Sequence, residues 1–95
     1  MITRIVKLTF KPESVPQFLQ IFEEMKHQIA GFEGCESLQL LKQTGSDTIY
    51  FTYSIWQHEK YLEAYRNSDF FINIWSKTKM HFADKAQAWT LETMA

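Results

Sequence analysis

The sequence has little of what marks several common classes of protein. One cysteine among 95 residues excludes an internal disulfide bond. No apolar run approaches the ~18–20 residues that a transmembrane helix needs, and the alternating, charged start MITRIVKLTF is unlike a signal peptide. We therefore predict a cytoplasmic protein with no membrane partner.

Net charge is nearly absent as well, since ten Lys and Arg oppose eleven Asp and Glu. A chain without a positive excess does not attract nucleic acid by its overall charge, and we predict no nucleic-acid partner. Aromatic residues, in contrast, make up 16% of the chain. Each ring buries a large apolar area, so this content indicates a core or a ligand site built around rings.

The hydrophobic pattern predicts one domain over residues 1–95, built from four strands and three helices. Strict alternation marks the strands, which we place at 2–10, 36–43, 48–56 and 86–93. Helical spacing marks the helices, which run from Val15 to Ile29, over QHEKYLEAY (57–65), and from a cap at Asn67 or Ser68 to Phe82. This order is that of the ferredoxin-like split βαβ fold, an α+β plan in which a four-stranded antiparallel sheet carries the helices on one face.

The strand predicted at 48–56 carries no charged residue on either face. The sheet face without helices would be polar if water covered it. We therefore predict that a second copy of the chain covers that face, in a two-fold, sheet-to-sheet homodimer. The alternative is a monomer with a mildly polar open face.

Two stretches resemble the antibiotic biosynthesis monooxygenase (ABM) family, which belongs to the dimeric α+β barrel superfamily. One is YSIWQHEKYLEAYRNSDFF, in which a strand ending in Trp56 leads through a short helix to Ser68 and Phe71. The other is GFEGC, between the first helix and the second strand. The resemblance extends over essentially the whole chain. It implies a ferredoxin-like homodimer with one pocket per subunit, between the helices and the sheet.

Characterised members of that family oxygenate aromatic substrates without a metal or a flavin. The resemblance therefore implies a monooxygenase with no cofactor and no metal, acting on a small quinol-like or anthrone-like aromatic molecule. In such a reaction the substrate loses a proton in an apolar site, and its anion reacts directly with dioxygen. A function of a different class is that of a non-catalytic homodimer that binds a small apolar ligand.

The chain departs from related proteins at positions that matter for the chemistry. Many ABM proteins have a histidine where this chain has Tyr65. The haem-degrading branch of similar fold uses an axial histidine, a tryptophan on the short helix and a small polar residue in the first strand. The corresponding positions here are Trp75, Tyr65 and Val6, so haem degradation is the weaker alternative.

Aromatic residues supply most of the predicted pocket. Tyr65 and Trp75 are the first candidates for its wall, because a buried Tyr or Trp needs a partner for its polar tip; plain packing in the core is the alternative. Phe71 belongs to the apolar stripe of the last helix. At most one of Tyr50 and Tyr53 can face the helices, since they lie on opposite faces of one strand. We favour Tyr53 because its parity is the more apolar.

Three polar residues complete the predicted site. Arg4 lies on the apolar parity of the first strand, where burial would require a carboxylate or an anionic ligand as partner, although we favour a surface position at a strand edge. His81 is a candidate base near neutral pH and Asn73 can reach a ligand carbonyl, but exposure is an open alternative for both.

The predicted roles follow from these residue types. The catalytic residues are Tyr65 and His81, and the substrate-binding residues are Trp75, Tyr53, Asn73, Phe71 and Arg4. A cavity that holds His81 or Arg4 near a tyrosine hydroxyl would favour the oxygenase. A cavity of Tyr65, Trp75 and Tyr53 with no titrating group would favour the binding protein.

Overall fold

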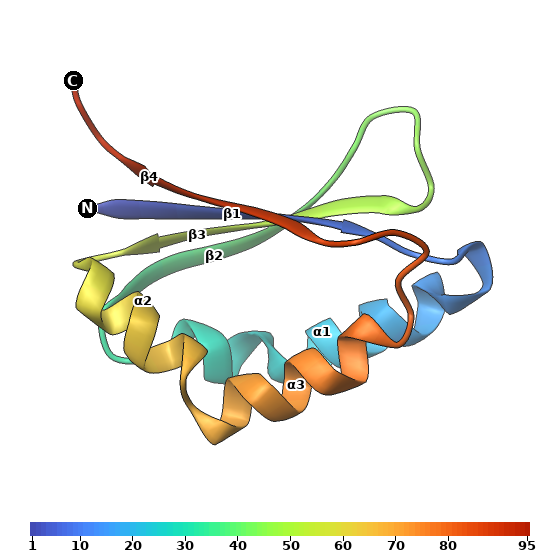
Figure 1. Cartoon of the computed structure of the whole chain (residues 1–95), viewed down its shortest axis with the longest axis horizontal. Helices are drawn as coiled ribbons and strands as arrows, with labels where there is room; N and C mark the ends of the chain where they lie inside the picture. Colours follow the sequence, from blue (N-terminus) through green and yellow to red (C-terminus); the bar gives the residue numbers. More distant parts are fainter.

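The computed structural model describes residues 1–95 and has the predicted ferredoxin-like α+β architecture (Figure 1). The strands are β1 (Ile2–Thr9), β2 (Cys35–Lys42), β3 (Ile49–Trp56) and β4 (Gln87–Glu92). The helices are α1 (Val15–Ala30), which follows a 3₁₀ turn at Pro12–Ser14, α2 (Glu59–Arg66) and α3 (Asp69–Lys79). Every predicted element is present, and only the ends of the elements differ from the prediction. None of the helices has the length and apolar character needed to cross a bilayer.

The four strands are antiparallel and lie in the order β2-β3-β1-β4. All three helices lie on one face of this sheet, and no part of the chain covers the other face (Figure 1). β1 is a central strand, between β3 and β4, so Arg4 does not lie at a sheet edge. The pairing sets Arg4 opposite Ser54 of β3 and Thr90 of β4.

The two parities of β3 face different surroundings. Tyr50 is buried against Phe18 of α1, and Trp56 is fully buried, so residues of their parity face the helices. Tyr53 has the opposite parity and pairs with Ile5 on the face turned away from the helices. The prediction that Tyr53 faces the helices is therefore wrong. The β3 residues of the more apolar parity lie on the uncovered face, so apolar character did not identify the side that faces the helices.

The core between sheet and helices has two clusters of buried residues. The first consists of Leu8, Phe10, Phe18 and Tyr50, and the second of Ile2, Trp56 and Leu62. Stacked rings make up much of each: the centroids of Phe10 and Phe18 are 4.2 Å apart, and those of Trp56 and Tyr65 are 5.2 Å apart. Burying each such ring contributes on the order of 1.5–3 kcal/mol, so both clusters hold the helices firmly on the sheet.

Side-chain caps fix where the last two helices begin. His58 caps α2 by accepting a hydrogen bond from the N–H of Lys60. Ser68 caps α3 by accepting one from the N–H of Phe71, and its own hydroxyl donates to the carbonyl of Tyr65. Ser68 therefore ties the end of α2 to the start of α3. As a result the rings of Tyr65 and Phe71 meet edge to face, 5.0 Å between centroids.

Candidate functional site

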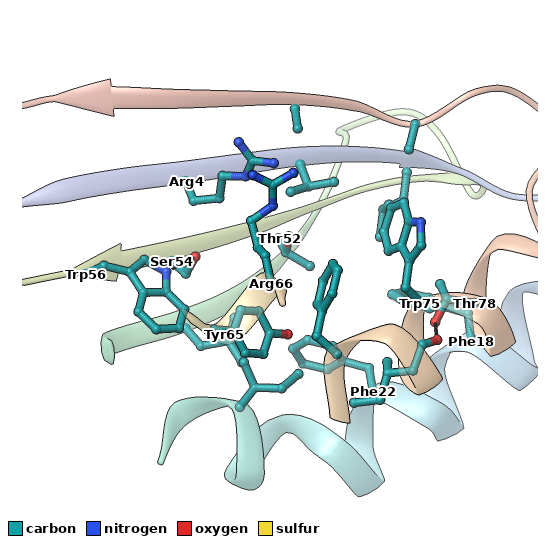
Figure 2. A pocket seen from close by; sticks show the side chains of 18 residues that line it. Arg4, Phe18, Phe22, Thr52, Ser54, Trp56, Tyr65, Arg66, Trp75 and Thr78 are labelled. Atoms are coloured by element: carbon teal, nitrogen blue, oxygen red, sulfur yellow. Dashed lines mark hydrogen bonds between the residues drawn. The ribbon is translucent and has the colours of Figure 1, made fainter. Parts of the chain in front are cut away.

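A cavity of about 320 Å³ lies between the sheet and the helices (Figure 2). This volume is at the lower end of the range for sites that enclose small ligands. Of its 18 lining residues, 13 are hydrophobic, so a ligand there would be largely apolar. The charged and hydroxyl-bearing residues of the wall are Arg4, Thr52, Ser54, Tyr65, Arg66 and Thr78.

Tyr65 of α2 lines the cavity with its hydroxyl free. Its ring is held between Trp56, Phe71 and Phe32, at 5.0–5.2 Å between centroids. The hydroxyl makes no hydrogen bond within the protein, and no buried side-chain N or O lacks a partner, so the hydroxyl is open to the cavity. Burial raises the pKa of Tyr65 far above its usual range, and the negative charge that the nearby Cys35 carries when ionised adds to this rise. The phenol therefore stays protonated at neutral pH and can donate a hydrogen bond.

Trp75 and Phe71 of α3 form an aromatic wall at another part of the cavity. Their rings stack at 5.8 Å between centroids and 15° between planes, and Phe82 packs edge-on against Trp75. Phe71 and Trp75 both line the cavity. The indole N–H of Trp75 makes no hydrogen bond within the protein. Because no buried side-chain N or O lacks a partner, this N–H, like the Tyr65 hydroxyl, is open to the cavity. The arrangement offers flat apolar surface with one free donor.

Trp56 and Ser54 of β3 form a closed hydrogen-bonded pair in the same wall. The indole N–H of Trp56 donates to Ser54 Oγ over 2.9 Å, and both residues are buried. Their neighbour on the same parity, Thr52, also lines the cavity. The sequence analysis missed these residues because it assigned the other parity to the helix side. The alternation of hydroxyl-bearing residues on one parity was the available signal.

Two guanidinium groups, those of Arg4 and Arg66, belong to the cavity wall. Arg4 extends from β1 and donates to Thr90 Oγ1 over 2.6 Å, while Arg66 ends α2 and pairs with Glu63 at 3.0 Å. Burial lowers the pKa of Arg4, the charge of Arg66 lowers it further, and Glu63 partly offsets both. The sequence analysis did not predict Arg66 as a site residue. The available signal was Leu62, which lies one helical turn earlier on the same side of α2 and faces the core.

Two other predicted site residues lie elsewhere. His81 follows the end of α3, where its carbonyl accepts the N–H of Lys11, and it does not line the cavity. Asn73 is exposed and lies in a separate groove of about 240 Å³ between α1 and α3. Exposure was the alternative that the sequence analysis gave for both residues, and neither residue reaches the cavity. The inward-facing stripe of α3 is that of Phe71, Trp75 and Thr78.

The ionisable groups of the wall are therefore Arg4, Arg66 and Tyr65, and the wall contains no carboxylate or imidazole. Nowhere in the structure do three His, Cys, Asp or Glu side chains come together as metal ligands do. Two positive charges and a protonated phenol can stabilise a bound anion. They cannot accept a proton from a substrate at neutral pH.

The fold and the cavity together define a ferredoxin-like domain with a ligand-sized space between its sheet and its helices. A sequence model of the family described as "Antibiotic biosynthesis monooxygenase" matches residues 1–74. The chain belongs to this ABM family, as its motifs predicted. No curated protein matches the chain.

Solved structures of similar fold cover nearly the whole chain. One described as an antibiotic biosynthesis monooxygenase has a TM-score of 0.93 at 14% identity and covers 100% of both chains. A conserved protein from Methanosarcina mazei Go1 has a TM-score of 0.92 at 20% identity, over 99% of this chain and 94% of that one. SnoaB, described as a cofactor-independent oxygenase from Streptomyces nogalater, has a TM-score of 0.87 at 13% identity, over 99% and 93%. At these identities the likeness is one of fold.

Proposed function

We propose that this chain is a cofactor-independent monooxygenase that oxygenates a small quinol-like or anthrone-like aromatic molecule in the cavity between its sheet and its helices. The observation that carries the proposal is the presence of Arg4 and the free Tyr65 hydroxyl in one apolar, ring-lined cavity. Membership of the ABM family supports it. So does the likeness in fold to SnoaB, described as a cofactor-independent oxygenase.

The proposed reaction balances with dioxygen as the only co-reactant. For an anthrone-like substrate, a CH₂ group that is conjugated with the carbonyl through the aromatic rings loses a proton to give an enolate. The enolate carbon bonds to dioxygen, and protonation gives a hydroperoxide that loses water to leave a second carbonyl. One oxygen atom ends in the product and the other in water, and all the electrons that reduce dioxygen come from the substrate.

The wall residues have separate roles in this proposal. Tyr65, held protonated by burial, donates a hydrogen bond to the enolate oxygen. Arg4 supplies positive charge that favours the anion over the neutral substrate. Phe71 and Trp75 hold the rings in one plane. Because the wall contains no carboxylate or imidazole, the substrate proton passes to water, and the rate should follow the ionisation of the substrate as pH rises.

We also propose that the protein works as a homodimer joined through the outer face of the sheet. That face combines half-buried apolar residues of β1 and β3 with exposed ones on β2 and β4. The main ones are Ile5, Leu41, Phe51, Tyr53, Ile55, Trp89 and Leu91. An apolar surface of this kind, left open to water, is typical of a protein interface.

A non-catalytic protein that binds a small apolar ligand is the second candidate. The observation in its favour is the lack of a carboxylate or imidazole base in the wall. Haem degradation has no such support, because no histidine lines the cavity. Trp75 lies in the wall where the haem-degrading branch has its axial histidine, and Val6 lies where that branch has a small polar residue.

Oxygen uptake tests the proposal. Metal-stripped protein is mixed with a panel of anthrones and hydroquinones, and uptake is compared with that of Tyr65→Phe, which removes one hydroxyl. We expect uptake that depends on the protein and falls by about tenfold or more in this variant. Tyr61→Phe is the matched control, since Tyr61 lies on the same helix outside the cavity wall, and it should keep wild-type uptake. Tight binding of the panel with no uptake would instead support the binding protein.

A further inference from the structure

The guanidinium groups of Arg4 and Arg66 come from different elements, β1 and α2, yet lie at the same part of the cavity (Figure 2). Their charges repel each other, which is one cause of the lowered pKa of Arg4. Such a juxtaposition costs free energy in the empty protein. An anion placed between the two groups would reverse that cost.

The pair has fewer negative partners than positive charges. Arg66 has one carboxylate partner, Glu63, at 3.0 Å. Arg4 has no carboxylate within 4.0 Å, and its one side-chain hydrogen bond is to the neutral hydroxyl of Thr90. Two positive charges against one negative charge leave an excess of one. Because a guanidinium carries five N–H donors, Arg4 also has donors left for a ligand.

A role at the protein surface alone does not explain the position of Arg4. It is on a central strand, between Ser54 and Thr90, and is half-buried on the helix side of the sheet. A methylene-rich arginine can cover apolar surface from an edge, but this one enters the wall of a cavity. Partly desolvated guanidinium groups in proteins are typically matched by carboxylates or phosphates.

We infer that Arg4 and Arg66 form an anion subsite in the cavity, which binds the carboxylate of a flat aromatic acid while the aromatic wall of Phe71 and Trp75 holds its rings. One excess positive charge matches the single charge of a carboxylate, and the planar forks of the two guanidinium groups match its two oxygens. This inference rests on the proposed function for the premise that the cavity takes an aromatic molecule, and it adds the charged group by which that molecule is selected.

A pair of probes with the same rings isolates the charge. The probes are 2-naphthoate and its neutral analogue 2-naphthamide, and binding at neutral pH and low salt is measured by calorimetry and by quenching of tryptophan fluorescence. We expect wild-type protein to bind the anion about tenfold or more tightly than the amide, which is about 1.4 kcal/mol. Arg4→Gln should bring the two affinities within about twofold, chiefly by weakening binding of the anion, since it replaces the positive charge with a neutral amide.

Two further variants make the result specific to the pair. Arg66→Gln, on the more exposed side of the subsite, should reduce the preference for the anion even where Arg4→Gln impairs folding. Lys11→Gln removes a positive charge outside the cavity wall and should keep the full preference. Equal binding of both probes by wild-type protein, no binding of either at millimolar concentration, or a preference that survives both arginine substitutions would overturn the inference.

The inference and the proposed function fail in different ways. A preference for the anion that depends on Arg4, together with no oxygen uptake, would overturn the oxygenase and support the subsite. Oxygen uptake that depends on Tyr65, together with equal binding of the two probes, would overturn the subsite and support the oxygenase.

Discussion

The two faces of the sheet do not divide polar from apolar residues in the usual way. An antiparallel sheet with one buried face normally puts its polar residues toward water. Here the helix-side face carries Arg4, Thr52 and Ser54 around a cavity, whereas the uncovered face exposes Trp89 by 43% and Leu91 by 46%. Polar groups at an unfilled space suit a ligand, and apolar groups at an uncovered face suit another protein surface. We therefore expect the helix side of the sheet to bind a ligand and the uncovered face to bind another protein surface.

A charge on the outer face should have the largest effect on this comparison. Trp89→Glu places a carboxylate on β4 beside Ile5 of β1, where dimer formation would bury it without a partner. Such burial costs several kcal/mol, so we expect dimer affinity to fall by at least about 100-fold. Light scattering after size-exclusion chromatography measures the mass. Lys85→Glu, an exposed change just before β4, should leave a dimer; a monomeric wild type would refute the interface.

On the helix side, the next largest effect is expected at Gly34, before β2. Its φ is +85°, and a Cβ there would collide with the ring of Tyr61 on α2. Gly34→Ala should lower the free energy of unfolding by more than about 2 kcal/mol, because strain and collision add. Gly45→Ala separates the two causes. Its φ is +84° with nothing within 4 Å of the new Cβ, so denaturant unfolding should show a loss of only about 1 kcal/mol. Equal losses would exclude the collision.

The buried phenol of the cavity predicts how stability depends on pH. The folded pKa of Tyr65 is raised by burial, so above about pH 10 the unfolded chain loses a proton that the folded protein keeps. Stability therefore falls as pH rises, by up to about 1.4 kcal/mol per pH unit from this group. Tyr65→Phe should show a shallower fall in urea unfolding above pH 10, and the comparison at each pH cancels the titration of other groups. Parallel curves would mean that the phenol is not desolvated.

The smallest effect is expected at the partner of Arg66. Glu63→Gln removes the negative charge that offsets the two arginines and should raise affinity for 2-naphthoate by about two- to fivefold. The pair is exposed, so the free energy of unfolding should change by less than about 0.5 kcal/mol. Glu23→Gln breaks an equivalent pair with Lys26 on α1 and should change neither quantity. A similar gain in both variants would reflect net charge alone.

Much of the fold followed from periodicity, and the parity of β3 shows where that information ends. Alternation located the strand, but both of its parities lack charge, so the side facing the helices depends on which neighbours it meets. The same applies to the cavity. Tyr65, Phe71 and Trp75 could be predicted because their helical stripes point inward, and Arg4 because of its parity. Ser54 was missed because the side of β3 that faces the helices could not be identified from the sequence, and Arg66 because its approach to the wall depends on how α2 crosses the sheet.

His81 shows the converse limit. Its residue type suggested a base, but it follows the last turn of α3, beyond the stripe that faces the cavity. Chemistry read from residue type alone therefore added a group that the fold does not bring to the cavity. The remaining wall has positive charge and a protonated phenol, a combination that suits an anion more than proton abstraction by the protein.

The measurement that tests the central claim most directly is the fate of isotopic oxygen. Metal-stripped, flavin-free protein is incubated with an anthrone under ¹⁸O₂, and the quinone product is analysed by mass spectrometry against a Tyr65→Phe sample. Our account predicts one ¹⁸O atom in each product molecule, the other in water, and a lower yield in the variant. Product without ¹⁸O, or the same labelled yield with and without the protein, would contradict a cofactor-independent oxygenase acting in this cavity.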